Sequence, residues 1–323
     1  MKTAQNSISD QIHTALKKIS PLNRIFIGYS GGVDSHVLLH ACAVLPEFEG
    51  KICAVYIHHG LQKAADDWAT HCEKMAKNLG VQFLTFPVDA HSKRGQSPEE
   101  AARNARYEVL KKLLTENDVL LIAQHREDQL ETVLLQLFRG SGLKGLAGMP
   151  QKMAFGAGQL LRPLLDIGKN EITAYALENQ LNWIEDPSNQ STIYDRNFLR
   201  QEIIPHLKQR WQSLDKTVAR TATHCAQAQD LIAEIAQTEL SQVLNTDNSL
   251  HIPHLLSYSP TQQHLILREW FAYLNLRMPS QDFLQRILSE VIFAAIDRHP
   301  KLHKNGVIVT REKSKLVLTL TNQ

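Results

Sequence analysis

The chain has 323 residues, of which 43% are hydrophobic and 21% are charged, and its formal net charge is +2. This is the composition of a folded globular protein, which excludes a largely disordered chain, and the length allows two domains. The nearly balanced charge excludes a strongly basic protein, so any surface for nucleic acid must be local. No apolar run is long enough to cross a bilayer and no apolar leader occurs, so we expect a cytoplasmic protein without membrane contact.

None of the cysteines belongs to a C-x-x-C pair, and the first three have apolar neighbours. We therefore expect small core residues in a protein from a reducing compartment. The first three are Cys42, Cys53 and Cys72, and the fourth is Cys225.

The first predicted elements are a strand, a glycine-rich turn and a helix. An amphipathic helix over 7–19 precedes an apolar run, Ile25 to Tyr29, which stops at the hexapeptide Ser-Gly-Gly-Val-Asp-Ser of residues 30–35. Adjacent glycines let the backbone turn tightly, so that successive N–H groups converge on an anion at the positive end of the helix. Phosphate is the expected anion, although the loop matches neither a Walker A sequence nor the dinucleotide fingerprint. The alternative is an ordinary turn with a capping Asp or Ser.

The second predicted strand, 51–57, ends in His58-His59-Gly60-Leu61. In a doubly wound parallel sheet ligands bind at the carboxyl ends of the strands, which makes His58 a candidate for nucleotide binding. Neighbours on an extended chain point to opposite sides, so one metal ion cannot easily take both histidines. A helix over 63–79 and a third strand over 81–86 follow.

The next helix begins with two independent signals, a capping box from Ser97 to Glu100 and a proline at the first helical position. Spacing places Arg103, Arg106 and Tyr107 on one face of this helix. Two arginines beside a phosphate site would hold the triphosphate or a tRNA phosphate. The alternative is a solvated helix face.

A fourth strand over 118–123 leads into an amphipathic helix whose apolar residues recur through Phe138. Asp128, Glu131 and Thr132 share one side of its first turn, where the helix dipole keeps carboxylates ionised and suited to magnesium or an amine. The alternative is a helix start rich in acids only because acids stabilise it. Four strand–helix units in a row predict an α/β domain with a parallel sheet, so this helix start and the 30–35 loop would lie at the same edge.

The stretch 137–149 reads as a glycine-punctuated loop with two cations, Arg139 and Lys144, and its glycines suggest close approach to a ligand. A fifth strand over 159–165 with Arg162 and a helix over 168–180 come next. Dense polar groups follow at 183–189 and 195–200.

Eight motifs occur in order along the chain: Ser-Gly-Gly-Val-Asp-Ser, His-His-Gly-Leu, Ala-Arg-Tyr, His125-x-x-Asp128-x-x-Glu131-Thr132, Arg139-Gly-Ser-Gly, Arg162-Pro-Leu-Leu, Glu185-Asp-Pro-Ser-Asn and Arg196-Asn-x-x-Arg200. Together they resemble the tRNA(Ile)-lysidine synthetase family of the ATP pyrophosphatase (PP-loop) superfamily over about the whole chain. Two positions depart from the family: Gln124 stands in place of a histidine, and Arg126 is unusual.

The resemblance implies that ATP adenylates the C2 oxygen of the wobble cytidine in the CAU anticodon of tRNA(Ile). The ε-amine of free L-lysine then displaces AMP. The product, lysidine, pairs with A instead of G, which changes codon reading from AUG to AUA and aminoacylation identity from methionine to isoleucine. ATP and Mg²⁺ are the implied cofactors, and the oligomeric state is left open, with a homodimer as one option.

The resemblance also implies roles for single residues. Asp34 and Asp128 would hold magnesium, and Glu131 or Asp128 would bind or deprotonate the attacking ammonium. Phosphates would be clamped by Arg103, Arg106 and Arg196. The expected nucleotide-binding residues are Ser30, Gly31, Gly32, Val33, Asp34, Ser35 and His58.

We expect a PP-loop catalytic domain at 1–210, a helical linker at 211–248 and a small α+β tRNA-binding domain at 249–323. The last would contain helices over 261–275 and 280–297 and a terminal hairpin of strands 306–310 and 315–320. Longer members of the family carry one further domain after this unit.

Two other functions use the same loop. A tRNA-thiolating enzyme needs cysteines for sulfur transfer or an iron–sulfur cluster, usually with C-x-x-C spacing, which this sequence lacks. A nucleotide sensor or tRNA-binding protein without catalysis would not need ordered carboxylates beside a pyrophosphate loop. Release of AMP separates an enzyme from a sensor.

Overall fold

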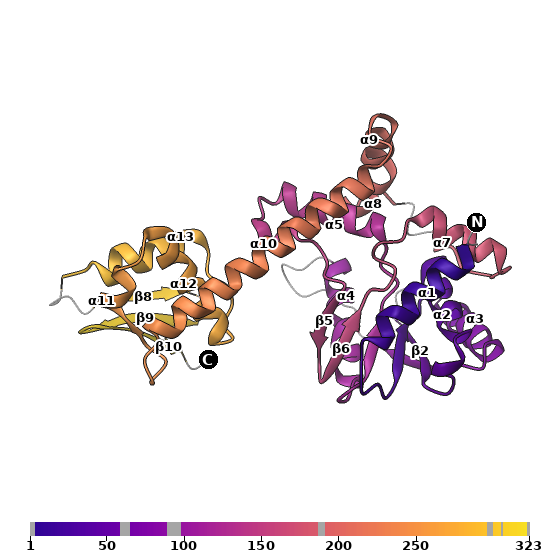
Figure 1. Cartoon of the computed structure of the whole chain (residues 1–323), viewed down its shortest axis with the longest axis horizontal. Coiled ribbons are helices and arrows are strands. Elements are labelled where there is room, and N and C mark those ends of the chain that lie inside the picture. Colours follow the sequence, from indigo (N-terminus) through magenta and orange to yellow (C-terminus); the bar gives the residue numbers. More distant parts are fainter. Residues whose placement is uncertain are drawn as a thin grey trace. The chain divides into compact units, whose positions relative to one another are not determined.

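The computed structural model of the chain describes residues 4–58, 65–88, 98–186, 191–295, 300–304 and 306–321. The chain divides into two compact units, residues 1–226 and 227–323 (Figure 1). Helix α10, Leu214–Val243, begins in the first unit and ends in the second. The finer division into a domain, a linker and a small domain stays a prediction.

The first unit is built on a six-stranded sheet in the order β3-β2-β1-β4-β6-β5. Every neighbouring pair from β3 to β6 is parallel, with Ile25 of β1 opposite both Ile52 of β2 and Val119 of β4. The carboxyl ends of these strands therefore share one edge of the sheet. The strands are β1 (Ile25–Gly28), β2 (Ile52–His58), β3 (Gln82–Pro87), β4 (Val119–Leu121), β5 (Lys152–Phe155) and β6 (Gly158–Leu161).

The parallel sheet is confirmed, and the outermost strand, β5, which was not predicted, adds to it antiparallel to β6. Only residues 156 and 157 join the two strands, and Gly156 has φ +61°. Two residues leave no room for a crossover helix, so the strands form a hairpin. The predicted fifth strand also ends early, at Leu161 instead of residue 165.

Helices cover both faces of the sheet, and alternate residues of each strand enter different cores. Ile25 and Ile27 pack in a cluster closed by α1, α2, α3 and α7, whereas Phe26 packs in a cluster closed by α4. Burial on both faces explains why the strands read as continuous apolar runs. The helices are α1 (Ala4–Lys17), α2 (Val33–Ala43), α3 (Ala65–Asn78), α4 (Pro98–Leu113), α5 (Arg126–Phe138), α6 (Leu143–Leu146), α7 (Lys169–Glu178), α8 (Asp195–Phe198) and α9 (Ile204–Arg210), with a 3₁₀ turn at Pro46–Phe48 and a π-helical segment at Leu199–Ile203.

The first unit differs from the prediction in one short segment and agrees with it in the placement of its cysteines. The stretch 137–149, expected to be a loop, contains the short helix α6. Cys42, Cys53 and Cys72 are buried core residues, as predicted. Among the helices that the structure describes, none combines the length and the apolar character needed to cross a bilayer.

The second unit has a four-stranded antiparallel sheet in the order β7-β10-β9-β8, with helices around a core centred on Trp270, Phe271 and Phe283. The predicted terminal hairpin is confirmed as β9 and β10. The elements are β7 (Leu250–His251), α11 (Ile252–Leu256), α12 (Pro260–Tyr273), α13 (Gln281–Arg286), a π-helical segment (Ile287–Ile292), β8 (Lys301–Lys304), β9 (Val307–Glu312) and β10 (Lys315–Leu320).

The helix predicted over 280–297 ends at Ile292 instead. Arg311 of β9 donates hydrogen bonds to the carbonyl oxygens of Ile292 and Ala294, at 2.6 and 3.0 Å. These bonds satisfy carbonyl groups that a helix end leaves open, so a distant strand sets the boundary.

Candidate active site

The turn between β1 and α2 requires glycine at one position for two reasons. Gly31 has φ +81°, in the left-handed region that other residues avoid, and a Cβ there would lie 2.8 Å from Sγ of Cys72 and 2.9 Å from Cδ1 of Ile184. Its carbonyl oxygen accepts a hydrogen bond from the N–H of Ile184 at 2.9 Å. The loop therefore packs against Cys72 of α3 and Ile184 of the segment after α7.

The loop presents an open helix N-terminus. Gly32 is the N-cap of α2, and no side chain within the described residues caps it. The first helical bond is made by the N–H of His36, so the amides of the turn before it have no partner within the helix and carry the positive end of the dipole. The hydroxyls of Ser30 and Ser35 lie 3.1 Å apart at this turn. The N–H of Ser30 donates to Oγ of Ser35, which donates to the carbonyl oxygen of Gly32. Binding of an anion by the amides and hydroxyls of this turn stays a prediction.

Asp34, in the first turn of α2, faces two basic side chains from other elements. Its Oδ1 lies 2.5 Å from Nζ of Lys169, and its Oδ2 lies 3.8 Å from Nε2 of His125. Lys169 was missed by sequence reasoning. The available signal was its position directly after Gly168, at the start of the helix that follows the fifth strand.

His125 joins the loop to the start of α5. It is 4% exposed and serves as the N-cap of α5, with Nδ1 3.2 Å from Oε2 of Glu127 and Nε2 3.5 Å from Oδ2 of Asp128. Burial acts to lower the pKa of His125, but the hydrogen bond to Glu127 and the charges of Asp128 and Asp34 outweigh it and raise the pKa above its ordinary value. His125 thus lies between Asp34 and Asp128, whose charges favour its protonated form.

Glu127, also missed by sequence reasoning, stabilises this arrangement. Burial acts to raise its pKa, but hydrogen bonds from His125 and from the backbone N–H of Lys169 lower the pKa to about 2. The N–H of Lys169 donates at 2.9 Å, and Nζ of Lys208 lies 3.5 Å from the other carboxylate oxygen. Glu127 is therefore an ionised anchor, not a proton carrier near neutral pH.

Two arginines hold Glu131, which is only 1% exposed. Nε of Arg196 donates to Oε2 at 2.8 Å and Nε of Arg200 donates to Oε1 at 2.6 Å. The arginines are four residues apart across α8 and the π-helical segment, so they share one face. Arg200 also donates to Oδ1 of Asp128 at 3.1 Å. Both oxygens of Glu131 are thus engaged, and Asp128 is the more exposed of the two acids.

The guanidinium groups of Arg103 and Arg106 lie over the ring of Tyr107, with Cζ 4.8 and 5.8 Å from its centre. Cation–π contacts of this kind hold a guanidinium in place without neutralising it. The part that these two arginines take in phosphate binding stays a prediction.

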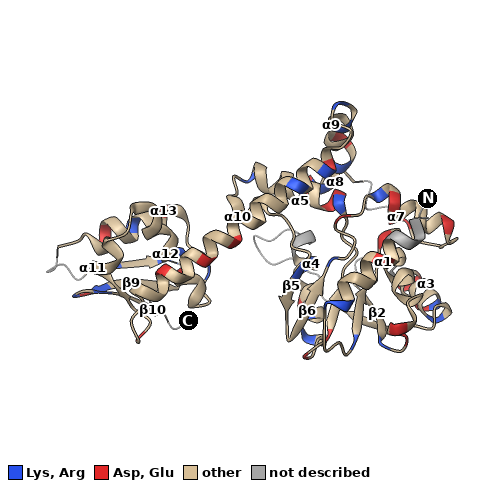
Figure 2. Cartoon of the chain, viewed as in Figure 1, with Lys and Arg blue, Asp and Glu red and all other residues tan. Residues whose placement is uncertain are grey.

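Gln124 and Arg126, the two residues that depart from the family pattern, both form hydrogen bonds to other elements. Oε1 of Gln124 accepts a hydrogen bond from Nε of the buried Arg162 at 2.5 Å, which ties the end of β4 to the end of β6. Nε of Arg126 donates to Oδ2 of Asp215 at 2.7 Å, at the start of α10. Figure 2 shows residues of both charges along the neighbouring α8 and α9. Gln124 and Arg126 therefore serve to position the site.

His58 ends β2, and its Nε2 lies 3.0 Å from Oδ1 of Asp66 in α3. Its predicted contact with the nucleotide stays a prediction. Several motif positions lie outside the described residues: His59, Gly60, Leu61, Ser97 and the Pro-Ser-Asn of 187–189.

The cations of the glycine-punctuated stretch are both exposed, Arg139 directly after α5 and Lys144 within α6. Leu137 and Phe138, the last residues of α5, are also exposed. Basic and apolar side chains on one exposed segment suit a nucleic acid better than a small ligand.

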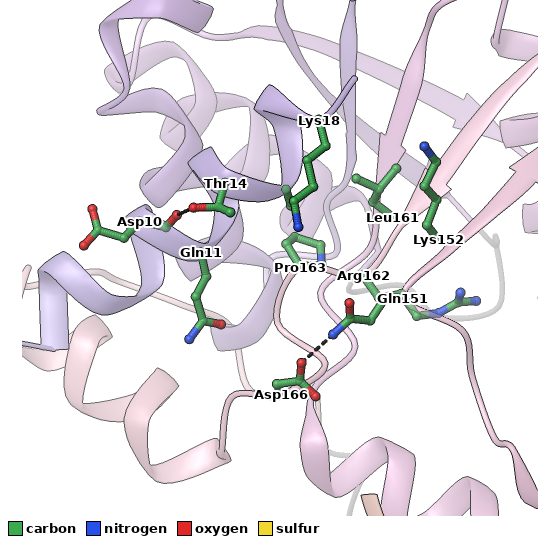
Figure 3. A pocket seen from close by; sticks show the side chains of 11 residues that line it. Asp10, Gln11, Thr14, Lys18, Gln151, Lys152, Leu161, Arg162, Pro163 and Asp166 are labelled. Carbon is green, nitrogen blue, oxygen red and sulfur yellow. Dashed lines mark hydrogen bonds between the residues drawn. The ribbon is translucent and has the colours of Figure 1, made fainter. Parts of the chain in front are cut away.

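A cavity of about 480 Å³ lies between α1 and the turn after β6 (Figure 3). Gln151 and Asp166, on one wall, are joined by a hydrogen bond, and the other wall is lined by Asp10 of α1 and by Lys18, directly after that helix. Its lining includes neither the loop of residues 30–35 nor the carboxylates around His125. We assign it no part in the site.

The donor set fits magnesium shared with a nucleotide. Within the described part of the chain, no three His, Cys, Asp or Glu side chains form a metal-binding group. Magnesium in phosphoryl-transfer sites needs only one or two carboxylates, together with substrate phosphates and water. Asp34 and Asp128 are the predicted pair, and each has an oxygen within 3.8 Å of Nε2 of His125; their binding of magnesium stays a prediction.

Comparison with known proteins places these features in one family. The PP-loop domain family matches residues 4–207, and the TilS substrate binding domain family matches residues 250–317. The tRNA(Ile)-lysidine synthase of Proteus mirabilis is 43% identical over 310 residues, which cover 95% of this chain and 70% of that protein. That of Photorhabdus laumondii is 42% identical over 308 residues, covering 94% and 70%.

Among solved structures, the U34-tRNA thiolase NcsA from Methanococcus maripaludis, with its [4Fe-4S] cluster, is similar with a TM-score of 0.56 and 17% identity. The likeness covers 68% of this chain and 78% of that one and shows the fold alone.

The chain is a PP-loop ATP-binding protein, as the order of its sheet, the open N-terminus of α2 and the match to the PP-loop domain family together define. Within that class, the chain belongs to the tRNA(Ile)-lysidine synthase family.

Proposed function

We propose that this chain forms lysidine at the wobble cytidine of tRNA(Ile), with ATP and free L-lysine as the other substrates. The C2 oxygen of the cytosine in the CAU anticodon attacks the α-phosphorus of ATP and pyrophosphate leaves. The ε-amine of lysine then attacks C2, and the C2–O bond breaks to release AMP. The substrates meet in the cytoplasm. The observation that carries the proposal is the connection of the anion-binding loop, through Asp34 and His125, to the carboxylates of α5.

The first step needs charge neutralisation, because pyrophosphate is a highly charged leaving group. The amides of residues 30–35 and the hydroxyls of Ser30 and Ser35 would bind it at the N-terminus of α2. Arg103 and Arg106 would add positive charge from α4. Magnesium held by Asp34 and Asp128 would, when bound, neutralise the phosphate oxygens.

The second step needs a carboxylate for the lysine ammonium. Both acids have both oxygens engaged, Glu131 by Arg196 and Arg200, and Asp128 by Arg200 and the backbone N–H of His125. Glu131 is the poorer candidate because its side chain is almost wholly buried, whereas that of Asp128 is partly exposed. We therefore assign ammonium binding to Asp128 and give Glu131 the task of fixing the two arginines. Arg196 would then act through Glu131 and Thr132, to which it donates at 3.0 Å, before any contact with phosphate.

The second unit would contribute to the grip on tRNA, in keeping with its match to the TilS substrate binding domain. The cytosine must leave the anticodon stack to react, and an anticodon loop offers its bases at little cost.

The test is release of AMP measured with ATP, tRNA(Ile) and lysine added singly and together. We expect AMP release that depends on tRNA and runs to completion only with lysine, and we expect Asp34→Ala to abolish it without loss of the fold. A sensor would bind ATP and make no AMP. Product formation with a sulfur donor in place of lysine would overturn the proposal in favour of a thiolase.

A further inference from the structure

A cavity opens at the corner where α9 ends and α10 begins (Figure 1). Its volume is about 430 Å³, and its lining consists of Leu207, Trp211, Ser213, Leu214 and Thr217. Trp211 is the largest of these side chains and is 58% exposed. A mostly apolar hollow of this size, with an aromatic side chain open to solvent, is typical of a binding site. The lining contains neither the loop of residues 30–35 nor the acids of α5, so the cavity is separate from the active site.

The backbone of this corner is held in place. The N–H of Trp211 donates to the carbonyl oxygen of Leu207 at 2.9 Å, and the carbonyl oxygen of Trp211 accepts from the N–H of Leu214 at 3.0 Å. Leu214 also packs against a small core that contains Leu130 of α5, the helix that begins with the acids of the site. The indole is therefore presented from a fixed backbone that is attached to the catalytic helix, which lowers the entropic cost of binding.

Three exposed cations lie next to the cavity residues along α9 and α10. Arg210 directly precedes the indole, Arg220 lies three residues after Thr217 on the same face of α10, and Lys216 lies one turn before Arg220. Asp215, the acid of this turn, is buried and already paired within the active-site network. In the ranges that the structure describes, no acid forms an ion pair with any of the three cations. An uncompensated positive surface therefore borders an aromatic cavity.

We propose that this corner binds an unpaired nucleotide of the substrate tRNA, with its base against the indole of Trp211 and its neighbouring phosphates on Arg210, Lys216 and Arg220. The inference rests on the proposed function in taking tRNA as the substrate. An aromatic side chain beside a positive surface is the combination that binds single-stranded nucleic acid, because every base has a face that can stack. An anticodon loop supplies unpaired bases. The bound nucleotide is not the reacting cytidine, since the cavity is separate from the active site, and it would hold the loop while the cytidine reacts.

The aromatic contact is tested by binding of a synthetic anticodon stem–loop of tRNA(Ile), without ATP or lysine, followed by fluorescence anisotropy of the labelled RNA. For Trp211→Ala we expect the affinity to fall about tenfold, the loss typical of one stacked base. The slope of log affinity against log salt should stay unchanged, because the indole carries no charge. Trp211→Phe keeps an aromatic face and should recover most of the affinity, while losing the quenching of tryptophan fluorescence that the RNA causes in the parent protein.

The ionic contact has the opposite signature. Replacing Lys216 and Arg220 together with alanine should reduce the salt slope by about one to two, because fewer counterions are released from the RNA. Leu177→Ala is the matched control for the loss of an exposed apolar side chain, since Leu177 lies on α7. It should change neither the affinity nor the slope.

Unchanged RNA affinity of Trp211→Ala would overturn the proposal, as would absence of RNA binding by the parent protein. A loss of RNA affinity accompanied by a lowered melting temperature and an equal loss of ATP binding would overturn it in favour of a structural role. Self-association that Trp211→Ala abolishes, with RNA affinity retained, would instead make the corner an interface between copies of this chain. None of these measurements uses lysine transfer, so RNA binding through Trp211 without lysidine formation would refute the proposed function alone.

Discussion

At the scale of single residues, the site is a set of charged and polar side chains that hold one another in place around the buried Glu131 and His125. Glu131 is enclosed by Arg196 and Arg200, and His125 stands between Asp34 and Asp128. Breaking a buried pair by removing one partner leaves the other charge desolvated and uncompensated. Stability and chemistry therefore depend on the same side chains.

Glu131→Gln should lower the free energy of unfolding by about 3 kcal/mol, because two guanidinium groups lose their shared carboxylate. Urea denaturation measures this. Glu290→Gln is the control, since Glu290 pairs with Arg286 on an exposed face and its loss should change stability little. Equal small effects of both substitutions would mean that the cluster around Glu131 adds nothing to stability.

The pKa shifts of Glu127 and His125 predict opposite pH dependences. The pKa of Glu127 is lowered to about 2, so its stabilisation is present above the ordinary pKa near 4.5 and is lost as the pH falls toward 2. The pKa of His125 is raised, so its stabilisation is present below the ordinary pKa of 6.5 and is lost as the pH rises through the folded value. The difference in unfolding free energy between the parent protein and Glu127→Gln should thus be largest near pH 5 to 6. A difference that does not vary with pH would contradict this account.

At the scale of elements, the strand–loop–helix unit carries the anion site. The loop depends on the left-handed conformation of Gly31, where there is no room for a Cβ. Gly32 has an extended backbone, and a Cβ added there would lie 3.6 Å from Oγ of Ser30, which is an ordinary contact. Of the two neighbouring glycines, only Gly31 is required by the backbone conformation and by the packing.

Gly31→Ala should cost about 2 kcal/mol or more of stability, from the conformational strain and the overlap with Cys72 and Ile184. Gly32→Ala should stay within about 0.5 kcal/mol. Thermal unfolding of the two variants makes the comparison, and an equal cost at both positions would argue against the described loop geometry.

The sequence predicted the elements that local patterns determine and missed those set by distant contacts. The parallel strands, the loop and the helix starting at the acids of α5 followed from apolar periodicity and glycine placement. The hairpin strand β5 was missed although its two-residue turn was visible. The helix end at Ile292 depends on Arg311, and the pairing of Lys169 with Asp34 joins residues 135 positions apart, which no local pattern reports.

At the scale of the whole molecule, tRNA must be bound by local basic surface, because the net charge is only +2. The exposed Arg139 and Lys144 are two candidates in the first unit. Replacing both with alanine should weaken tRNA binding and reduce the slope of log affinity against log salt by about one to two, with little change in ATP binding. Lys51→Ala, at an exposed lysine directly before the amino end of β2, should leave the slope unchanged. Equal loss of ATP and tRNA binding would instead place these cations at the nucleotide.

The central claim is that this chain joins lysine to the wobble cytidine of tRNA(Ile). The most direct measurement is transfer of radiolabelled lysine to unmodified tRNA(Ile) with a CAU anticodon, with AMP quantified in the same reaction and the labelled nucleotide identified by nuclease digestion. We expect one lysine per AMP, located at the wobble position, and no label on a methionine tRNA with the same anticodon or from other amino acids. AMP formation that depends on tRNA without any transfer of lysine would contradict it.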